Sequence, residues 1–394
     1  MTVFRHRSFK VFLEKSLCLL QDLTIRVTIC IMKRREQCAV CPQEYLSAFS
    51  LNPDRVIYFD IETTGFRPST SSLYMIGWAV RTGSSWTVTQ ILSESSREEA
   101  LLLSEFARVL HSYDTLVAFN GDRFDLPYMR EKYELHNMED PFAHMKTVDL
   151  YREIRPFRHA LGMTRLNQKS VEQFLGISRE DPYTGGELID VYRSVRDQRC
   201  TSISAALDAL FLHNLEDVTG MMEMTPLLSY RLAIDSMALV NVKVSDSGIE
   251  ASYPLAVHVP EPLHLVFEPG CSITLQETTA RISIRMLSGC LYHYFPDYRN
   301  YYYLPEEDTA IHKSVSSFVD PAHREKATAQ TSYVKKEGTF LPMNGRSGTI
   351  RQDKPLFRRY YKDPVSWFEY LPSMEEDPSF SSYLHDLVRA ASGT

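Results

Sequence analysis

The chain has 394 residues, of which 44% are hydrophobic and 24% charged, so it is long enough for two domains that each bury a core. Its formal net charge of −7 excludes a whole-molecule attraction to nucleic acid, so any such binding must depend on a local basic patch. The seven cysteines are scattered, and their odd number favours reduced thiols in the cytoplasm over a disulfide framework.

Residues 1–53 form a poorly specified N-terminal extension. Its longest apolar stretch, 17–32, is interrupted by polar and charged residues, so it is too polar to span a bilayer and lacks the apolar region of a signal peptide. Cys38 and Cys41 have the spacing of half a zinc site, but no second pair follows at finger spacing. We therefore expect ordinary thiols and no membrane association.

From residue 55 onward, short apolar runs alternate with segments of helical periodicity. We expect strands at 56–61, 73–80, 86–92, 116–120 and 147–151, and helices at 97–111, 127–132, 170–175, 187–195 and 203–224. This order predicts an α/β domain over residues 54–228, in which helices flank a mixed sheet and the first three strands form a meander.

The pattern changes after residue 228. Alternating polar and apolar positions over 238–295 predict a smaller, mainly antiparallel β (α+β) domain at 229–370, followed by a tail at 371–394. Residues 310–362 contain 11 Lys and Arg against 4 Asp and Glu, with tyrosines in and just before them. Two interpretations stay open for this stretch: a nucleic-acid grip, and a solvated charged face beside core tyrosines.

Four carboxylates fall at the ends of predicted core elements. Burying a carboxylate there costs free energy unless a partner such as a divalent cation binds it. Asp60 and Glu62 lie two apart on one strand, so both point to the same face. His213 and Asp217 are stacked four apart on one helix, and Asp125 follows another strand. Convergence of these residues would hold two Mg2+ or Mn2+ ions for phosphodiester hydrolysis, with His213 as a general base.

The neighbours of these acids are candidates for substrate binding. Thr63 and Gly65 follow Glu62, and a glycine lets the backbone pass close to a phosphate. Asn120 would contact substrate or orient the site, and Phe124 would pack against a terminal base or within the core. Each motif alone is most often a cap, a loop or a surface pair, but the three together in this order favour a metal site.

The three motifs resemble those of the DEDD exonuclease superfamily, which has the ribonuclease H-like fold. The resemblance covers about residues 54–228 and is strongest to the YprB-like group of predicted bacterial exonucleases, to which the stretch 166–177 is also similar. The matching motifs are Asp60-Ile-Glu62-Thr-Thr-Gly, Asn120-x3-Phe124-Asp125 and His213-x3-Asp217.

The resemblance implies metal-dependent 3′→5′ hydrolysis of single-stranded DNA or RNA ends, with nucleic acid as partner and no protein partner inferable. One feature departs from the family pattern. The His-type branch places its histidine five residues before the last Asp and the Tyr-type branch places a tyrosine four before it, whereas His213 stands four before Asp217. One helical position turns a side chain by about 100°, so the role of His213 stays open.

Two other functions fit the same residues. The first is a nucleic-acid binding or scaffold protein with a weakly active ribonuclease H-like domain, and the second is a ribonuclease H-type endonuclease. In the exonuclease interpretation the C-terminal domain grips the substrate, and Lys313, Arg324 and Lys326 are the cations expected to contact phosphates.

Overall fold

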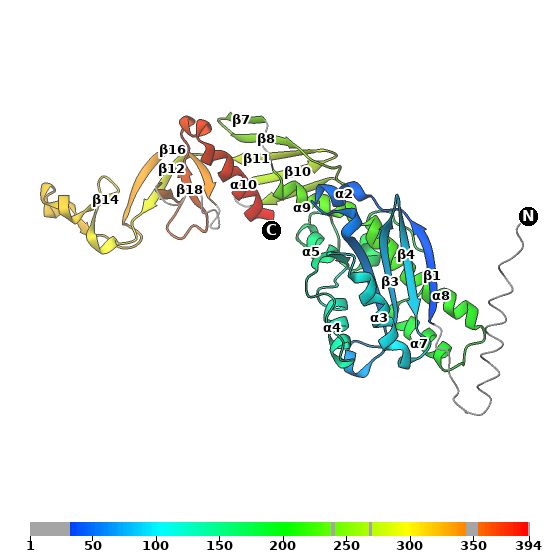
Figure 1. Cartoon of the computed structure of the whole chain (residues 1–394). Coiled ribbons are helices and arrows are strands. Elements are labelled where there is room, and N and C mark those ends of the chain that lie inside the picture. The colour runs from blue at the N-terminus through cyan, green and yellow to red at the C-terminus, as the bar shows by residue number, and fades with distance from the viewer. Residues whose placement is uncertain (1–31, 238–240, 268–269, 344–353, 393–394) are drawn as a thin grey trace, which may run out of the picture.

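The computed structural model describes residues 32–237, 241–267, 270–343 and 354–392, so residues 1–31 of the expected extension lie outside it. Figure 1 shows an elongated molecule in which a helix-covered sheet at one end is followed by smaller β structure toward the other. The expected fold class, a mixed α/β domain followed by a mainly antiparallel β region, is confirmed. No helix among the described residues is both long and apolar enough to cross a membrane.

A six-stranded mixed sheet forms the centre of the first domain, in the order β1-β4-β3-β2-β5-β6. Strands β2, β5 and β6 are parallel to one another, and the other neighbours are antiparallel. The strands are β1 (Lys33–Ala39), β2 (Val56–Thr63), β3 (Leu73–Thr82), β4 (Ser85–Leu92), β5 (Thr115–Ala118) and β6 (Lys146–Asp149).

Helices cover both faces of this sheet. They are α2 (Gln43–Ala48), α3 (Glu99–Leu110), α4 (Asp125–Leu135), α5 (Leu150–Ile154), α6 (Gln168–Phe174), α7 (Gly185–Arg196), α8 (Ile203–Glu223) and α9 (Leu228–Asp235). Because side chains alternate along β2, Ile57 and Phe59 pack in the cluster with α3 and α4, whereas Tyr58 packs in the cluster that contains α8. Asp60 and Glu62 share the parity of Tyr58, so they face α8.

Close packing of α8 on the sheet depends on Gly77 in β3. A Cβ atom at position 77 would lie 2.0 Å from the Oδ1 atom of Asn214, which is fully buried on α8. Asn214 accepts a hydrogen bond from Gln90 of β4 (2.9 Å) and donates one to Asp60 Oδ2 of β2 (2.9 Å). A buried polar side chain therefore fixes α8 across three strands.

The structure adds elements that hydrophobic periodicity does not reveal. Strand β1 and helix α2 lie within the segment 1–53, and β1 is an edge strand of exposed, mainly polar residues without apolar alternation. The strand expected at 147–151 ends at Asp149, whose side chain accepts hydrogen bonds from the amides of Tyr151 and Arg152 and so caps α5. Helix α4 is longer than the expected 127–132 segment and begins at Asp125.

The C-terminal region contains three antiparallel sheets, in the orders β7-β8-β11-β10-β9, β12-β16-β18-β17 and β14-β13-β15. The first comprises β7 (Asn241–Ser245), β8 (Gly248–Pro254), β9 (Leu263–Phe267), β10 (Cys271–Gln276) and β11 (Thr279–Arg285). The second comprises β12 (Leu287–Tyr294), β16 (Tyr333–Met343), β17 (Leu356–Phe357) and β18 (Ser366–Glu369). The third comprises β13 (Tyr301–Leu304), β14 (Thr309–His312) and β15 (Glu325–Lys326).

Within the expected tail, 371–394, the structure contains helix α10 (Pro378–Ser392). Tyr383 on this helix is fully buried against Phe368, and its hydroxyl donates to the carbonyl oxygen of Pro342 at 2.7 Å. The helix is thus part of the core that joins the second sheet to α9, which Figure 1 shows beside it.

Candidate active site

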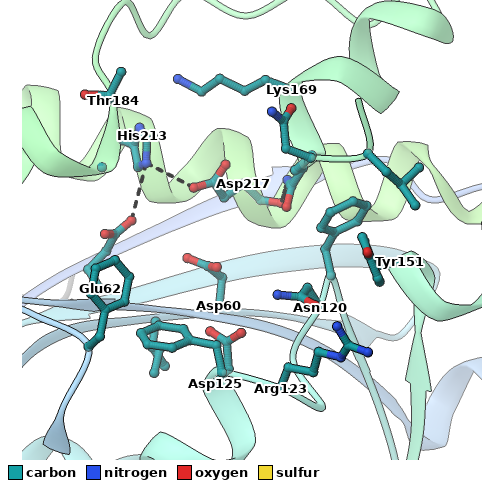
Figure 2. A pocket seen from close by; sticks show the side chains of 18 residues that line it. Asp60, Glu62, Asn120, Arg123, Asp125, Tyr151, Lys169, Thr184, His213 and Asp217 are labelled. Carbon is teal, nitrogen blue, oxygen red and sulfur yellow. Dashed lines mark hydrogen bonds and ion pairs between the residues drawn. The ribbon is translucent and has the colours of Figure 1, made fainter. Parts of the chain in front are cut away.

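A pocket of about 810 Å³ opens between strand β2 and helix α8. All five residues predicted to carry the chemistry line it, and Figure 2 shows their side chains directed toward one another. They are Asp60, Glu62, Asp125, His213 and Asp217. The structure therefore brings together residues from three separated segments of the sequence.

Glu62, His213 and Asp217 form the tightest group in this pocket. The Nε2 atom of His213 lies 3.2 Å from Asp217 Oδ2 and 3.7 Å from Glu62 Oε1. Each of the three residues offers one atom within 4.8 Å of the others, a spacing that suits a shared cation. Asp60 and Asp125 line the same pocket beside this group (Figure 2).

Burial, together with repulsion from neighbouring acids, makes Asp60, Glu62 and Asp125 hard to ionise. Burial raises the pKa of Asp60 well above its usual range, and the charges of Asp217, Glu62 and Asp125 add to the effect. Burial likewise raises the pKa of Glu62 to about 7, although the charge of His213 opposes it. The pKa of Asp125 is raised to about 7 by burial, against hydrogen bonds from the backbone. Several acids therefore lie in one pocket, and not every one of them has a positively charged group beside it.

A buried aspartate shapes the loop that carries Asn120. The backbone of Asn120 has φ = 60°, a left-handed conformation that asparagine tolerates better than most residues. Its amide donates to Asp149 Oδ1 at 2.8 Å, and the amide of Asp122 donates to Asp149 Oδ2 at 3.2 Å. Asp125 follows as the first residue of α4, where the helix dipole favours a negative charge.

Two residues that sequence reasoning missed hold the histidine and the last acid. Asp181 Oδ2 lies 2.6 Å from His213 Nδ1. Burial alone would raise the pKa of Asp181, but hydrogen bonds from the Tyr183 amide and from His213 lower it. Arg179 donates to Asp217 Oδ1 at 2.7 Å. In the sequence these residues stand in a turn, and no periodicity ties that turn to α8.

The buried carboxylate of Glu172 completes this support. Arg179 also pairs with Glu172 (3.1 Å) and with Glu216 (3.2 Å), so three carboxylates surround one largely buried guanidinium. Glu172 reaches it by passing over Gly220, where a Cβ atom would lie 2.1 Å from Glu172 Oε1. The glycine therefore permits the close approach of α6 to α8.

The predicted substrate-binding residues divide into three groups. Asn120 and Phe124 line the pocket. Thr63 and Gly65 are not among its lining residues; the Thr63 hydroxyl instead donates to the Gly65 carbonyl at 2.9 Å. The third group comprises Lys313, Arg324 and Lys326, which lie around β14. Figure 1 shows β14 at the end of the molecule opposite α4 and α7.

Comparison with protein families matches residues 57–229, less than half of the chain, to the RNase_H superfamily. This span contains the mixed sheet from β2 onward and all five pocket residues. Residues 57–229 form a ribonuclease H-like domain.

Individual proteins similar to this chain include DNA polymerase 1 of Aeropyrum pernix, which is 38% identical over 64 residues. That match covers 16% of this chain and only 6% of the polymerase. Among solved structures, the family B DNA polymerase of Pyrobaculum calidifontis is 14% identical with a TM-score of 0.35, and the match covers 69% of this chain and 39% of the polymerase. E. coli Exonuclease I in complex with an oligonucleotide is 13% identical with a TM-score of 0.26, over 40% of this chain and 43% of that protein.

The donor set of the ribonuclease H-like domain suits hard divalent cations. Carboxylate oxygens are the preferred ligands of Mg2+ and are also suited to Mn2+. Burial, with neighbouring acids adding to it, raises the pKa values of Asp60, Glu62 and Asp125, and a cation bound beside them would favour their charged forms. Cys38 and Cys41 are not among the residues that line this pocket; Cys38 is exposed, and the Cys41 thiol lies 3.5 Å from the buried hydroxyl of Tyr58.

Proposed function

We propose that the ribonuclease H-like domain is a metal-dependent 3′→5′ exonuclease of the DEDD type, most similar to the YprB-like group. One observation carries the proposal: four carboxylates and an imidazole from three segments converge in a single open pocket. Burying this many acids costs free energy, and a function that needs a cation accounts for that cost.

Asp60, Glu62, Asp125 and Asp217 are the residues that would hold two Mg2+ or Mn2+ ions. Such ions, when bound, activate a water molecule and stabilise the charge that develops on the phosphate and the leaving oxygen. Asn214 orients Asp60 from behind through a 2.9 Å hydrogen bond, and Arg179 orients Asp217 through a 2.7 Å hydrogen bond. These contacts fix the carboxylates before any substrate arrives.

His213 is the proposed general base. Its Nε2 atom lines the pocket, so it can take a proton from water while the water oxygen forms a bond to phosphorus. The bond between phosphorus and the 3′ oxygen of the preceding nucleotide breaks, and that oxygen takes a proton from solvent. The products are a nucleoside 5′-monophosphate and a strand one nucleotide shorter.

Aromatic rings on the pocket wall support an unpaired strand end as substrate. Phe66, 89% exposed, stands 5.9 Å from Phe124 in an edge-to-face pair, and Phe119 stands 6.0 Å from Tyr151 in another. All four rings line the pocket. Unstacked bases bind to such rings irrespective of sequence, whereas paired bases present no free face. DNA and RNA ends both fit this description.

The C-terminal basic segment is proposed as a second contact for the same strand. Lys313 and Arg324 lie over the ring of Tyr302, at 5.6 and 4.9 Å from its centroid, and Lys326 is exposed on β15. Cations around an aromatic ring are a common surface for single strands. Because Figure 1 places β14 far from the helices of the pocket, this contact would bind nucleotides away from the one being cut.

A product ladder tests the function against its two alternatives. A 5′-labelled single strand of DNA or RNA is incubated with the full chain and Mg2+ or Mn2+, beside Asp60→Ala. Stepwise shortening in the wild type alone supports the exonuclease. Internal cuts of an RNA–DNA hybrid indicate a ribonuclease H-type endonuclease, and binding without cleavage indicates a scaffold protein. Activity that survives the Asp60 substitution contradicts the metal site.

A further inference from the structure

The imidazole of His213 is held between two sets of carboxylates. Its Nε2 atom faces the pocket acids, at 3.2 Å from Asp217 Oδ2, while its Nδ1 atom lies 2.6 Å from Asp181 Oδ2. The histidine is 6% exposed, so water does not compete freely for either nitrogen. Unlike Asp60 and Glu62, Asp181 lies behind the ring and is not among the lining residues of the pocket.

Asp181 belongs to the connecting segment 177–184, which has no regular structure and runs between α6 and α7. Glu216 of α8 anchors this segment, accepting hydrogen bonds from the amides of Glu180 (2.7 Å) and Asp181 (3.1 Å). Arg179 ties the segment to Asp217 on the same helix. The segment is therefore fixed to the helix that carries His213, although it lies more than thirty residues away in sequence.

The carboxylate of Asp181 is itself oriented by further contacts. Its Oδ1 atom accepts the amide of Tyr183 at 3.0 Å, and its Oδ2 atom accepts Lys169 Nζ at 3.1 Å as well as facing His213. The side chain is 1% exposed. A carboxylate with this many fixed donors has one orientation available, and it directs a lone pair at Nδ1 of the ring.

We propose that Asp181 is a positioning residue: through Nδ1 it holds the His213 ring in the direction that turns Nε2 toward the pocket. The partner of one ring nitrogen fixes the direction of the other, and such partners are commonly needed for the activity of the group that they orient. The proposal rests on the proposed function for its catalytic consequence.

The position of His213 on α8 leaves the rotation of its ring to be fixed by another residue. The imidazole stands four residues before Asp217 on a regular helix, so its direction is set by the helix and not by a flexible loop. Asp181 approaches from the side opposite the pocket and fixes the remaining rotation of the ring. The alternative is that Asp181 only stabilises the connecting segment through Lys169.

The test compares the wild-type full chain with Asp181→Asn, in which an amide of the same size replaces the carboxylate, by steady-state nuclease kinetics with Mg2+ or Mn2+. We expect Asp181→Asn to lower kcat by about 100-fold, within the range of a lost general base, with KM little changed. In a His213→Ala background the same substitution should cost less than about twofold, because a residue that acts through another has nothing left to position. An equal loss in both backgrounds would mean a structural role.

Controls keep the two proposals separable. Asp190→Asn is a matched change on the exposed face of α7 and should not alter kcat. If Asp181→Asn does not fold, Asp181→Ser removes the charge but keeps an acceptor for the Tyr183 amide and serves the same comparison. A wild type without nuclease activity contradicts the proposed function, whereas an active wild type in which Asp181→Asn costs as much without His213 as with it contradicts only the role of Asp181.

Discussion

Two clusters of side chains in this molecule, each built around an aspartate, stabilise its charge in opposite ways. In the C-terminal region, Asp308 accepts hydrogen bonds from Tyr303 (2.6 Å) and Tyr333 and pairs with Lys335. The hydrogen bond from Lys335, followed by those of the tyrosines, lowers the pKa of Asp308 to about 2. In the pocket, burial and neighbouring acids raise the pKa of Asp60 well above its usual range.

The difference is the one expected between a structural carboxylate and the metal ligand proposed for Asp60. Asp308 carries its own cation and donors, so its charge is stabilised by the folded protein alone. Asp60 has a hydrogen bond from Asn214 but is buried beside three further acids, so the folded protein stabilises its charge poorly and a bound cation would relieve that cost. A count of acidic residues in the sequence does not distinguish the two cases, whereas their partners do.

Replacing the aspartate of each cluster by asparagine tests most directly whether the two carboxylates have different roles. We expect Asp60→Asn to lower kcat by about 10³-fold or more, since metal-supplied stabilisation is several kcal/mol and each 1.36 kcal/mol is tenfold. The metal-free variant should unfold at the same temperature as the wild type or higher, because the substitution removes repulsion. Steady-state nuclease kinetics and thermal unfolding in a chelator measure both effects.

Asp308→Asn is the matched partner of that experiment. It should leave kcat unchanged, since Asp308 lies in the C-terminal region and lines no part of the pocket. A loss of kcat in Asp308→Asn as large as in Asp60→Asn would mean that general destabilisation, not a missing metal ligand, explains the loss of activity.

Divalent ions provide the next largest effect. At 100 times its dissociation constant, a ligand stabilises the folded state by about 2.7 kcal/mol, which raises Tm by about 5–10 °C for a domain of this size. We expect Mg2+ or Mn2+ to produce a shift of this order in the wild type and in Asp308→Asn, and a much smaller one in Asp60→Asn. Differential scanning fluorimetry with and without the ion measures it; equal shifts in all three proteins would indicate binding elsewhere.

The contrast between clusters also explains what the sequence could predict. Residues Asp60 and Glu62 follow an apolar strand run, and His213 and Asp217 recur at helical spacing, so periodicity alone placed them on one face of β2 and one face of α8. Asp181 gave no such signal, because it stands in an irregular segment whose contacts with α8 are entirely tertiary. Strand β1 was likewise invisible, since an exposed edge strand needs no apolar alternation.

The basic segment offers a smaller test on the C-terminal side of the comparison. Replacing Lys313, Arg324 and Lys326 together by Ala should weaken binding of a single strand and reduce the slope of log K against log salt by about 2, at about 0.7 for each lost phosphate contact. With saturating substrate kcat should be unchanged. Fluorescence anisotropy at several salt concentrations measures the slope, and an unchanged slope would identify the segment as a solvated charged face.

The smallest expected effect is the contribution of Asp308 to the free energy of unfolding. The direction of its pKa shift determines how that contribution changes with pH. Because the side chain is 38% exposed, solvent screens its ion pair with Lys335, and we expect Asp308→Asn to lower the free energy of unfolding by only about 1 kcal/mol at neutral pH. A carboxyl whose pKa falls from 3.8 to about 2 on folding contributes its full stability above pH 3.8 and loses it as the pH falls toward 2. The difference between wild type and variant, measured by urea unfolding, should therefore be constant from neutral pH down to about 4 and shrink below it. A difference that instead grows on acidification would mean that the carboxyl is stabilised in its protonated form, as in the pocket, and the two clusters would then be alike.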